Sequence, residues 1–303
     1  MKEDRRCQNA SNKTAASSLA ALYDSHGFVG PIEILSRDEA NHALQAFHEW
    51  TESLTDQQVK GDLRFKMHLF LPFVNRIVRH PKLVEAVQQV LQTKHVLLWS
   101  CDFNVKEPNT EMRFSPHQDA TYAGLSPADQ CVTAWVALSH PVGEEQGCLR
   151  FKKESHKQGQ LPHVKQPSDV HNMLSRRQHV ADPFKEKEWV AVPLRGGEAT
   201  LHQFFTIHQS GPNRSTQPRV GLAIRYMAAS VIQTGKVRET VTLISGSLQH
   251  DGFDLEPDLP LDNPTEAEIR IGKEAHAEAM RREAANYFDG ADTSAYDESI
   301  NKD

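Results

Sequence analysis

The spacing of three side chains constrains this chain more than any other feature. His117 and Asp119 stand two residues apart in the run SPHQD, and a second histidine, His208, follows far downstream. In an extended strand, residues i and i+2 project from the same face, so His117 and Asp119 can hold one ion together. Two histidines and one carboxylate form the facial triad of Fe(II) oxygenases, which leaves coordination positions open. We therefore expect a metal site, although Zn or Mn would suit the same ligands.

A triplet of this kind also arises by chance in a chain with 16 histidines and 40 acidic residues, and would then be only a solvated strand end. The downstream segment argues for the metal site. Residues 201–208 and 219–227 are apolar runs separated by a turn-rich stretch, which predicts a hairpin with His208 nearly opposite Arg219.

An arginine among apolar neighbours has little reason to be buried unless it binds an anion. Its planar guanidinium donates two parallel hydrogen bonds to a carboxylate, such as the one at the far end of 2-oxoglutarate. Arg219 is the better candidate for this role. Arg225 shares its strand face but lies further along, and we expect it in a salt bridge or at the rim.

Several motifs resemble the phytanoyl-CoA dioxygenase family of Fe(II)/2-oxoglutarate oxygenases, namely HQDATYAGL, VTAWVAL, GCLRF with ESHK, and IHQSGPNRS followed by Arg219. The resemblance runs from about Leu19 to Phe253. It implies a double-stranded β-helix, which is a jelly roll of the cupin type. It also implies iron ligation by His117, Asp119 and His208, with Arg219 on the distal carboxylate of 2-oxoglutarate.

Further cosubstrate contacts follow from the same resemblance, at Lys66, Gln118, Trp135 and Ser210. Trp135 would wall the pocket or simply fill the barrel, and Lys66 offers only a flexible point charge where an arginine would fix geometry. Asn104, on a predicted strand before the metal-binding strand, is an additional candidate for a hydrogen bond to the cosubstrate.

The length of 303 residues and the 38% hydrophobic content fit one globular domain. We predict that it spans residues 19–290, mainly β with flanking α-helices, between a disordered tail (1–18) and an acidic tail (291–303). The net charge of −6 argues against nucleic acid as a partner. No apolar run reaches the roughly 20 residues of a membrane span. Four cysteines without a paired pattern suit a reducing compartment, so a cytoplasmic location is expected, with organelle import left open.

Local signals predict the helices and one long insertion. A first helix should cover residues 15–25 and end at Gly27, and Ser36 with Glu39 forms a capping box for a second. Pro81 begins a helix that ends near Gln92. A last helix should start at Asn263 and Pro264 and stop near Gly290. The polar insertion between residues 152 and 189 is expected to cover the substrate.

The expected activity is hydroxylation of a small molecule, with consumption of O2 and release of succinate and CO2 from 2-oxoglutarate. A halogenase of the same fold is a rival, but it needs a small residue where Asp119 stands. A non-catalytic member of the fold is the second rival, because fold does not fix function. The primary substrate is not identified by the sequence.

Overall fold

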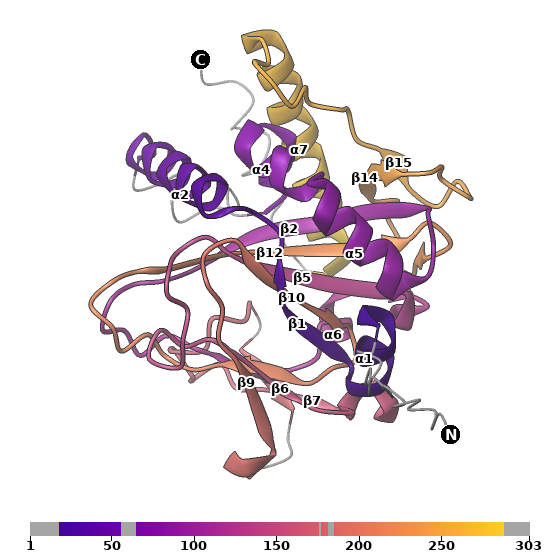
Figure 1. Cartoon of the computed structure of the whole chain (residues 1–303). Coiled ribbons are helices and arrows are strands. Elements are labelled where there is room, and N and C mark those ends of the chain that lie inside the picture. The colour runs from indigo at the N-terminus through magenta and orange to yellow at the C-terminus, as the bar shows by residue number, and fades with distance from the viewer. Residues whose placement is uncertain (1–17, 56–64, 176, 181–184, 288–303) are drawn as a thin grey trace, which may run out of the picture.

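In the computed structural model, the described residues are 18–55, 65–175, 177–180 and 185–287. Two layers of sheet face one another, and most helices cover the outer side of the larger sheet (Figure 1). The predicted fold, a double-stranded β-helix with flanking helices, is confirmed. Apart from Ser18, the two predicted tails lie outside the described residues, and the limits of the domain stay a prediction.

The larger sheet has seven strands, and all its pairs are antiparallel except the last. Their order is β1 (Phe28–Glu33), β10 (Glu198–Gln203), β5 (Cys131–Ala137), β12 (Arg219–Ala228), β2 (Val96–Lys106), β14 (Thr240–Ser245) and β15 (Asp254–Leu255). The smaller sheet is antiparallel, with the order β3 (Phe114–His117), β11 (His208–Ser210), β6 (Leu149–Lys152) and β9 (Trp189–Val192). Two short ladders join β4 (Leu125–Ser126) to β13 (Ile232–Gln233) and β7 (His163–Lys165) to β8 (Gln178–Val180).

Strand alternation separates the hydrophobic core from the site. On β12, Val220, Leu222 and Ile224 belong to the core cluster that also contains the helix residues. The alternate residues therefore face the space between the sheets, where Ala223 packs in a second cluster with Trp135. The larger sheet thus turns one face to the helices and the other face, which carries Trp135 and Ala223 as well as polar side chains, to the smaller sheet.

The helices follow their local signals. Helix α1 (Leu19–His26) is capped by Ser18 and ends at Gly27, whose φ of 86° suits glycine. Helix α2 (Arg37–Glu52) begins with the predicted capping box, and α5 (Pro81–Leu91) begins with proline as expected. The other helices among the described residues are η1 (Met67–Leu69), α4 (Pro72–Val78), α6 (Ala120–Ala123), η2 (Ala128–Gln130), η3 (Ser155–Gln158), η4 (Glu186–Glu188) and α7 (Glu266–Tyr287).

The predicted hairpin between residues 201–208 and 219–227 is wrong. The first run breaks into β10 and β11, and β11 pairs with β3 and β6 while β12 pairs with β2 and β5. The turn-rich stretch therefore crosses from one sheet to the other. Ser210 Oγ and Arg219 Nη1 approach to 3.4 Å in the interior between the sheets, a relationship that local turn signals cannot reveal.

Candidate metal centre and cosubstrate pocket

The three predicted metal ligands converge on one point. His117 on β3 and His208 on β11 are direct partners in the antiparallel ladder, and Asp119 follows β3 at the start of α6. One ligand atom from each lies within 4.8 Å of the others, and all three residues are buried. Asp119 Oδ1 is 3.5 Å from His117 Nε2 and 3.6 Å from His208 Nε2. These separations suit atoms that share one ion with bonds of about 2 Å.

Backbone carbonyls orient both imidazoles for metal binding. His117 Nδ1 lies 2.8 Å from the carbonyl oxygen of Ser115, and His208 Nδ1 lies 3.0 Å from that of Thr206. Because each Nδ1–H donates to a carbonyl, each Nε2 keeps its lone pair for an ion. Burial, followed by the nearby His117, holds the pKa of His208 well below its ordinary value. The ring is therefore neutral, as a ligand must be.

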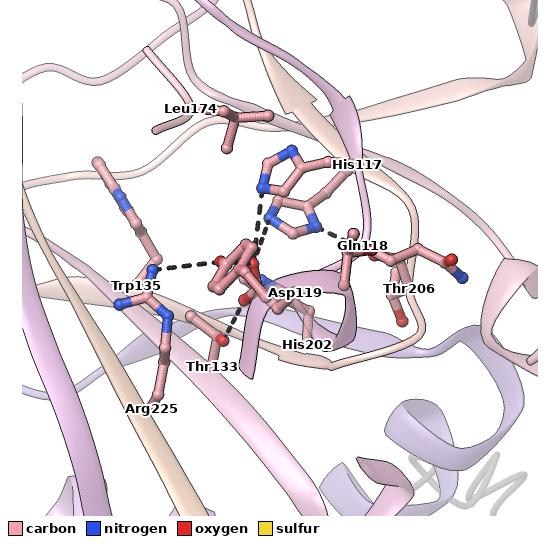
Figure 2. Close-up of polar contacts among 12 residues, drawn as sticks. His117, Gln118, Asp119, Thr133, Trp135, Leu174, His202, Thr206 and Arg225 are labelled. Carbon is pink, nitrogen blue, oxygen red and sulfur yellow. Dashed lines mark hydrogen bonds and ion pairs between the residues drawn. The ribbon is translucent and has the colours of Figure 1, made fainter. Parts of the chain in front are cut away.

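The carboxylate of Asp119 is held by two hydroxyl groups. The Tyr122 hydroxyl donates to Oδ1. The Thr133 hydroxyl donates to Oδ2 (Figure 2). Burial alone would raise the pKa of Asp119, but His208, His117 and His202 together hold it well below its ordinary value. An ionised carboxylate beside two imidazole rings is a donor set that fits a divalent ion such as Fe(II).

Arg225 reaches this carboxylate indirectly. Its guanidinium forms an ion pair with Asp102, as expected for a salt-bridged residue, and its Nη2 lies 3.4 Å from the Tyr122 hydroxyl oxygen. The polar chain therefore runs from Asp102 through Arg225 and Tyr122 to Asp119. This link to the metal ligands was not predicted.

Arg219 lies between the sheets with no carboxylate partner among the described residues. Its Nη1 donates to the carbonyl oxygen of Gly147 at 2.7 Å and approaches Ser210 Oγ at 3.4 Å. Its Nε has no hydrogen-bond partner in the described part of the chain. Burial lowers the pKa of Arg219 to about 9. A buried guanidinium in this state is suited to receive an anion.

Trp135 and Asn104 lie close to Arg219. Trp135 Nε1 donates to Asn104 Oδ1 at 3.1 Å, and the Arg219 guanidinium carbon lies 5.1 Å from the Trp135 ring centroid. A side chain at Gly221 would place its Cβ only 2.0 Å from the Trp135 ring, so glycine is required for the indole to lie flat against β12. Of the predicted cosubstrate residues, the structure therefore brings Arg219, Trp135, Asn104 and Ser210 together.

Lys106 is a second buried cation at this place. Its Nζ donates to the carbonyl oxygen of Ser210 at 3.0 Å and to that of Gly211, and it lies 2.6 Å from Ser210 Oγ. Burial and then the charge of Arg219 lower the pKa of Lys106 to about 5. Two basic side chains thus share Ser210 in a region where the described residues supply no acidic partner.

Two predicted cosubstrate residues lie elsewhere. Lys66 Nζ contacts Glu256 Oε1 at 2.6 Å in a fully buried ion pair that also includes His68. The Gln118 amide donates to the carbonyl oxygens of Gly159 and Phe205 and accepts from the backbone of Leu161. Gln118, just beyond the end of β3, points away from the triad (Figure 2).

Four residues at the site were missed, although the sequence carried a local signal for three of them. Tyr122 lies three residues after Asp119, one helical turn away. Thr133 and Lys106 lie two positions from Trp135 and Asn104 on strands whose alternation predicts a shared face. The fourth missed residue is His202 on β10, whose ring centroid lies 4.2 Å from that of His208.

The polar insertion packs against the metal-binding strand. Its strand β8 contacts β3, and Asn172 Oδ1 accepts a long hydrogen bond of 3.4 Å from the backbone of Ser115. His163 Nε2 accepts from the backbone of Gln118 at 3.0 Å. Leu174, which the insertion carries, is buried and is drawn on the His117 side of Asp119 in Figure 2.

Comparisons with known proteins agree with this geometry. Residues 23–221 match the family model described as phytanoyl-CoA dioxygenase (PhyH). Phytanoyl-CoA dioxygenase domain-containing protein 1 of Danio rerio is 28% identical over 54% of this chain, and the match spans 55%, about half, of that relative. Methylphosphonate hydroxylase of Gimesia maris is 25% identical, covering 75% of this chain and 85% of that protein.

A solved structure shares both the fold and some of the sequence. The apo form of ThoJ, described as a non-heme monooxygenase, superimposes with a TM-score of 0.76 at 25% identity, covering 93% of this chain and all of that one. The family match and the donor set confirm the predicted cofactors, Fe(II), 2-oxoglutarate and O2. Among the described residues, no helix combines the length and apolar character needed to cross a bilayer.

Proposed function

The chain belongs to the phytanoyl-CoA dioxygenase family, and from that premise we propose that it is an Fe(II)- and 2-oxoglutarate-dependent hydroxylase of a small molecule. The observation that carries the proposal is the buried set of His117, Asp119 and His208, with both imidazole Nε2 atoms turned toward one carboxylate oxygen. When bound there, iron with 2-oxoglutarate supplies oxidation of a C–H bond by O2, with release of succinate and CO2.

The protein's own residues prepare the site for that chemistry. Arg219 and Ser210 bind the distal carboxylate of 2-oxoglutarate, with Trp135 as one wall of its pocket and Asn104 hydrogen-bonded to the indole. His117, Asp119 and His208 would hold the metal ion and would leave open the positions at which the keto acid end of 2-oxoglutarate could bind. Leu174 and the insertion that carries it shield the site from water, which protects a reactive oxidant from side reactions.

The proposal favours hydroxylation over halogenation because a carboxylate occupies the third ligand position. Asp119 is buried and bonded by two hydroxyl groups. Chloride needs that position vacant, so the same residues that stabilise Asp119 argue against a halogenase.

The names of two relatives suggest a class of substrates to test. The Gimesia maris relative is named for methylphosphonate, and a Stutzerimonas stutzeri relative, 28% identical over 54% of this chain, is described as a probable hypophosphite dioxygenase. We therefore propose small phosphorus oxyanions as the first compounds to screen, with acyl-CoA thioesters as a second set. A cytoplasmic location is proposed because Cys101, Cys131 and Cys148 are buried free thiols, which suit a reducing compartment.

Succinate formation tests the proposed function. Purified protein with Fe(II), 2-oxoglutarate and air should release succinate faster when the true substrate is added, and Asp119→Gly should abolish the stimulated rate. A chain that binds both iron and 2-oxoglutarate but forms no succinate with any compound, even slowly, would instead be a non-catalytic member of the family.

A further inference from the structure

His202 is a buried polar side chain that the triad does not use. It lies on the inner face of β10 and is 1% exposed. Neither ring nitrogen has a hydrogen-bond partner within the described ranges. Buried polar atoms without partners destabilise a fold, so such a group in a native protein calls for an explanation at the site it faces.

The nearest acidic atom identifies what His202 faces. Its Nε2 lies 3.5 Å from Oδ2 of Asp119, slightly beyond a normal hydrogen bond. The ring is held between neighbours, with centroids 4.2 Å from His208 and 5.2 Å from Phe151. In Figure 2, His202 and Thr133 lie below Asp119 and His117 lies above it.

The two oxygens of Asp119 have different surroundings. Oδ1 lies between the Nε2 atoms of His117 and His208, and is therefore the atom that an ion would bind. Oδ2 is turned the other way and accepts a hydrogen bond from the Thr133 hydroxyl. An ionised carboxylate oxygen can accept two hydrogen bonds, so Oδ2 has one remaining position, on the side of His202.

We propose that His202 is a positioning residue that keeps Asp119 a monodentate ligand. A ring N–H of His202 and the hydroxyl of Thr133 together hold Oδ2, so only Oδ1 reaches the metal. A carboxylate that swung both oxygens onto the ion would occupy a position that 2-oxoglutarate or O2 needs, because the keto acid takes two positions and O2 takes one. This inference rests on the proposed function.

Binding measurements on three variants test the role. His202→Leu removes the ring nitrogens, His202→Gln keeps an N–H donor, and His276→Leu is a control at another buried histidine, bonded to the carbonyl oxygen of Phe65. Under anaerobic conditions, 2-oxoglutarate is titrated into Fe(II)-loaded protein and the visible charge-transfer band is followed. His202→Leu should lower 2-oxoglutarate affinity by about tenfold or more, the range seen when outer partners of metal ligands are removed. His202→Gln should recover most of the loss, and His276→Leu should match the wild type.

Coordination number supplies a second readout. In the Co(II)-substituted protein, the intensity and position of the visible ligand-field bands report how many ligands the metal has. His202→Leu should change this spectrum before 2-oxoglutarate is added, and Thr133→Val should change it in the same direction. If His202→Leu does not fold, Thr133→Val and His202→Gln still decide the matter through the same spectra.

The outcomes separate the two proposals. A wild-type protein that holds Fe(II) but gives no band with 2-oxoglutarate would remove the proposed function and this inference with it. A wild-type band accompanied by unchanged affinity and an unchanged Co(II) spectrum in His202→Leu would overturn the inference alone. The inference also fails if His202→Gln is as defective as His202→Leu, because the ring would then act through its shape.

Discussion

The guanidinium carbon of Arg219 lies 5.1 Å from the centroid of the Trp135 ring, and no carboxylate among the described residues pairs with it. A cation that is 1% exposed without an acidic partner is energetically unfavourable unless an anion joins it. Because Arg219 lies in the same interior as the triad, an anion bound to Arg219 would also lie between the two sheets. The account of the site depends on this relationship between a buried charge and a missing partner.

Arg219→Leu should weaken 2-oxoglutarate binding far more than Fe(II) binding, because it removes a buried cation and leaves the three ligands intact. Loss of one partner of a buried charge pair costs roughly 2 to 5 kcal/mol, which corresponds to about thirtyfold or more in affinity. Arg214→Leu is the control, since Arg214 lies on the loop between β11 and β12 in an exposed ion pair with Glu111. Equal affinities in the two variants would assign the carboxylate to another residue. Arg225 is a poor control because its contact with Tyr122 links it to Asp119.

The lowered pKa of Lys106 predicts that the protein takes up a proton when 2-oxoglutarate binds. Its pKa of about 5 leaves the amine neutral at pH 7, and a carboxylate nearby favours the ammonium form, which raises the pKa. Affinity for 2-oxoglutarate should therefore fall as pH rises between the pKa values of the free and bound states. Titration calorimetry in buffers of different ionisation enthalpy measures this uptake. It should be lost in Lys106→Met, and the same uptake in that variant would exclude Lys106 as the source.

Tyr122→Phe should weaken Fe(II) binding by about tenfold, the lower end of the effect of removing an outer partner of a metal ligand. The variant removes the hydroxyl that donates to Oδ1 of Asp119 and preserves the ring. Tyr226→Phe is the matched control, because the Tyr226 hydroxyl donates to the carbonyl oxygen of Val78 on the helix side of the sheet. Competition with a metal chelator measures both affinities. A Tyr122→Phe protein with wild-type affinity would show that Thr133 suffices to hold the carboxylate.

Lys66 is expected to affect stability rather than cosubstrate binding. Removing one partner of the buried Lys66 and Glu256 pair should cost about 3 to 5 kcal/mol, because the other charge remains buried. Urea unfolding of Lys66→Met measures the loss, and Lys66→Met combined with Glu256→Leu should recover part of it. If 2-oxoglutarate affinity fell in Lys66→Met without a loss of stability, the original cosubstrate role would stand.

The stability that the Lys66 and Glu256 pair contributes should depend on pH. Burial raises the pKa of Glu256, but Lys66 and His68 lower it by more than burial raises it. The pKa in the folded state therefore lies below the ordinary 4.5. The carboxylate therefore contributes stability above about pH 4.5 that is lost as pH falls through the folded pKa. Glu256→Gln should flatten the acid limb of the stability curve. An unchanged acid limb would mean that other carboxylates dominate acid unfolding.

Local patterns in the sequence predicted the triad and the helices, and long-range pairing explains what they missed. The spacing of His117 and Asp119 identified both ligands, but Asp119 lies beyond β3 at the N-cap of α6, so the i and i+2 alternation of a strand is not what brings them together. The path of the chain between His208 and Arg219 depends on which sheet each strand joins, and turn residues do not encode that. Lys66 was misplaced for a related reason, because its partner Glu256 lies 190 residues away.

Anaerobic addition of 2-oxoglutarate to the Fe(II)-loaded protein is the decisive measurement. If His117, Asp119 and His208 hold one iron with positions open for a bidentate keto acid, and Arg219 binds its far end, a weak visible charge-transfer band should appear. This band should saturate at one 2-oxoglutarate per iron and be lost in His208→Ala. Iron bound at one equivalent with no band at saturating 2-oxoglutarate would contradict this prediction.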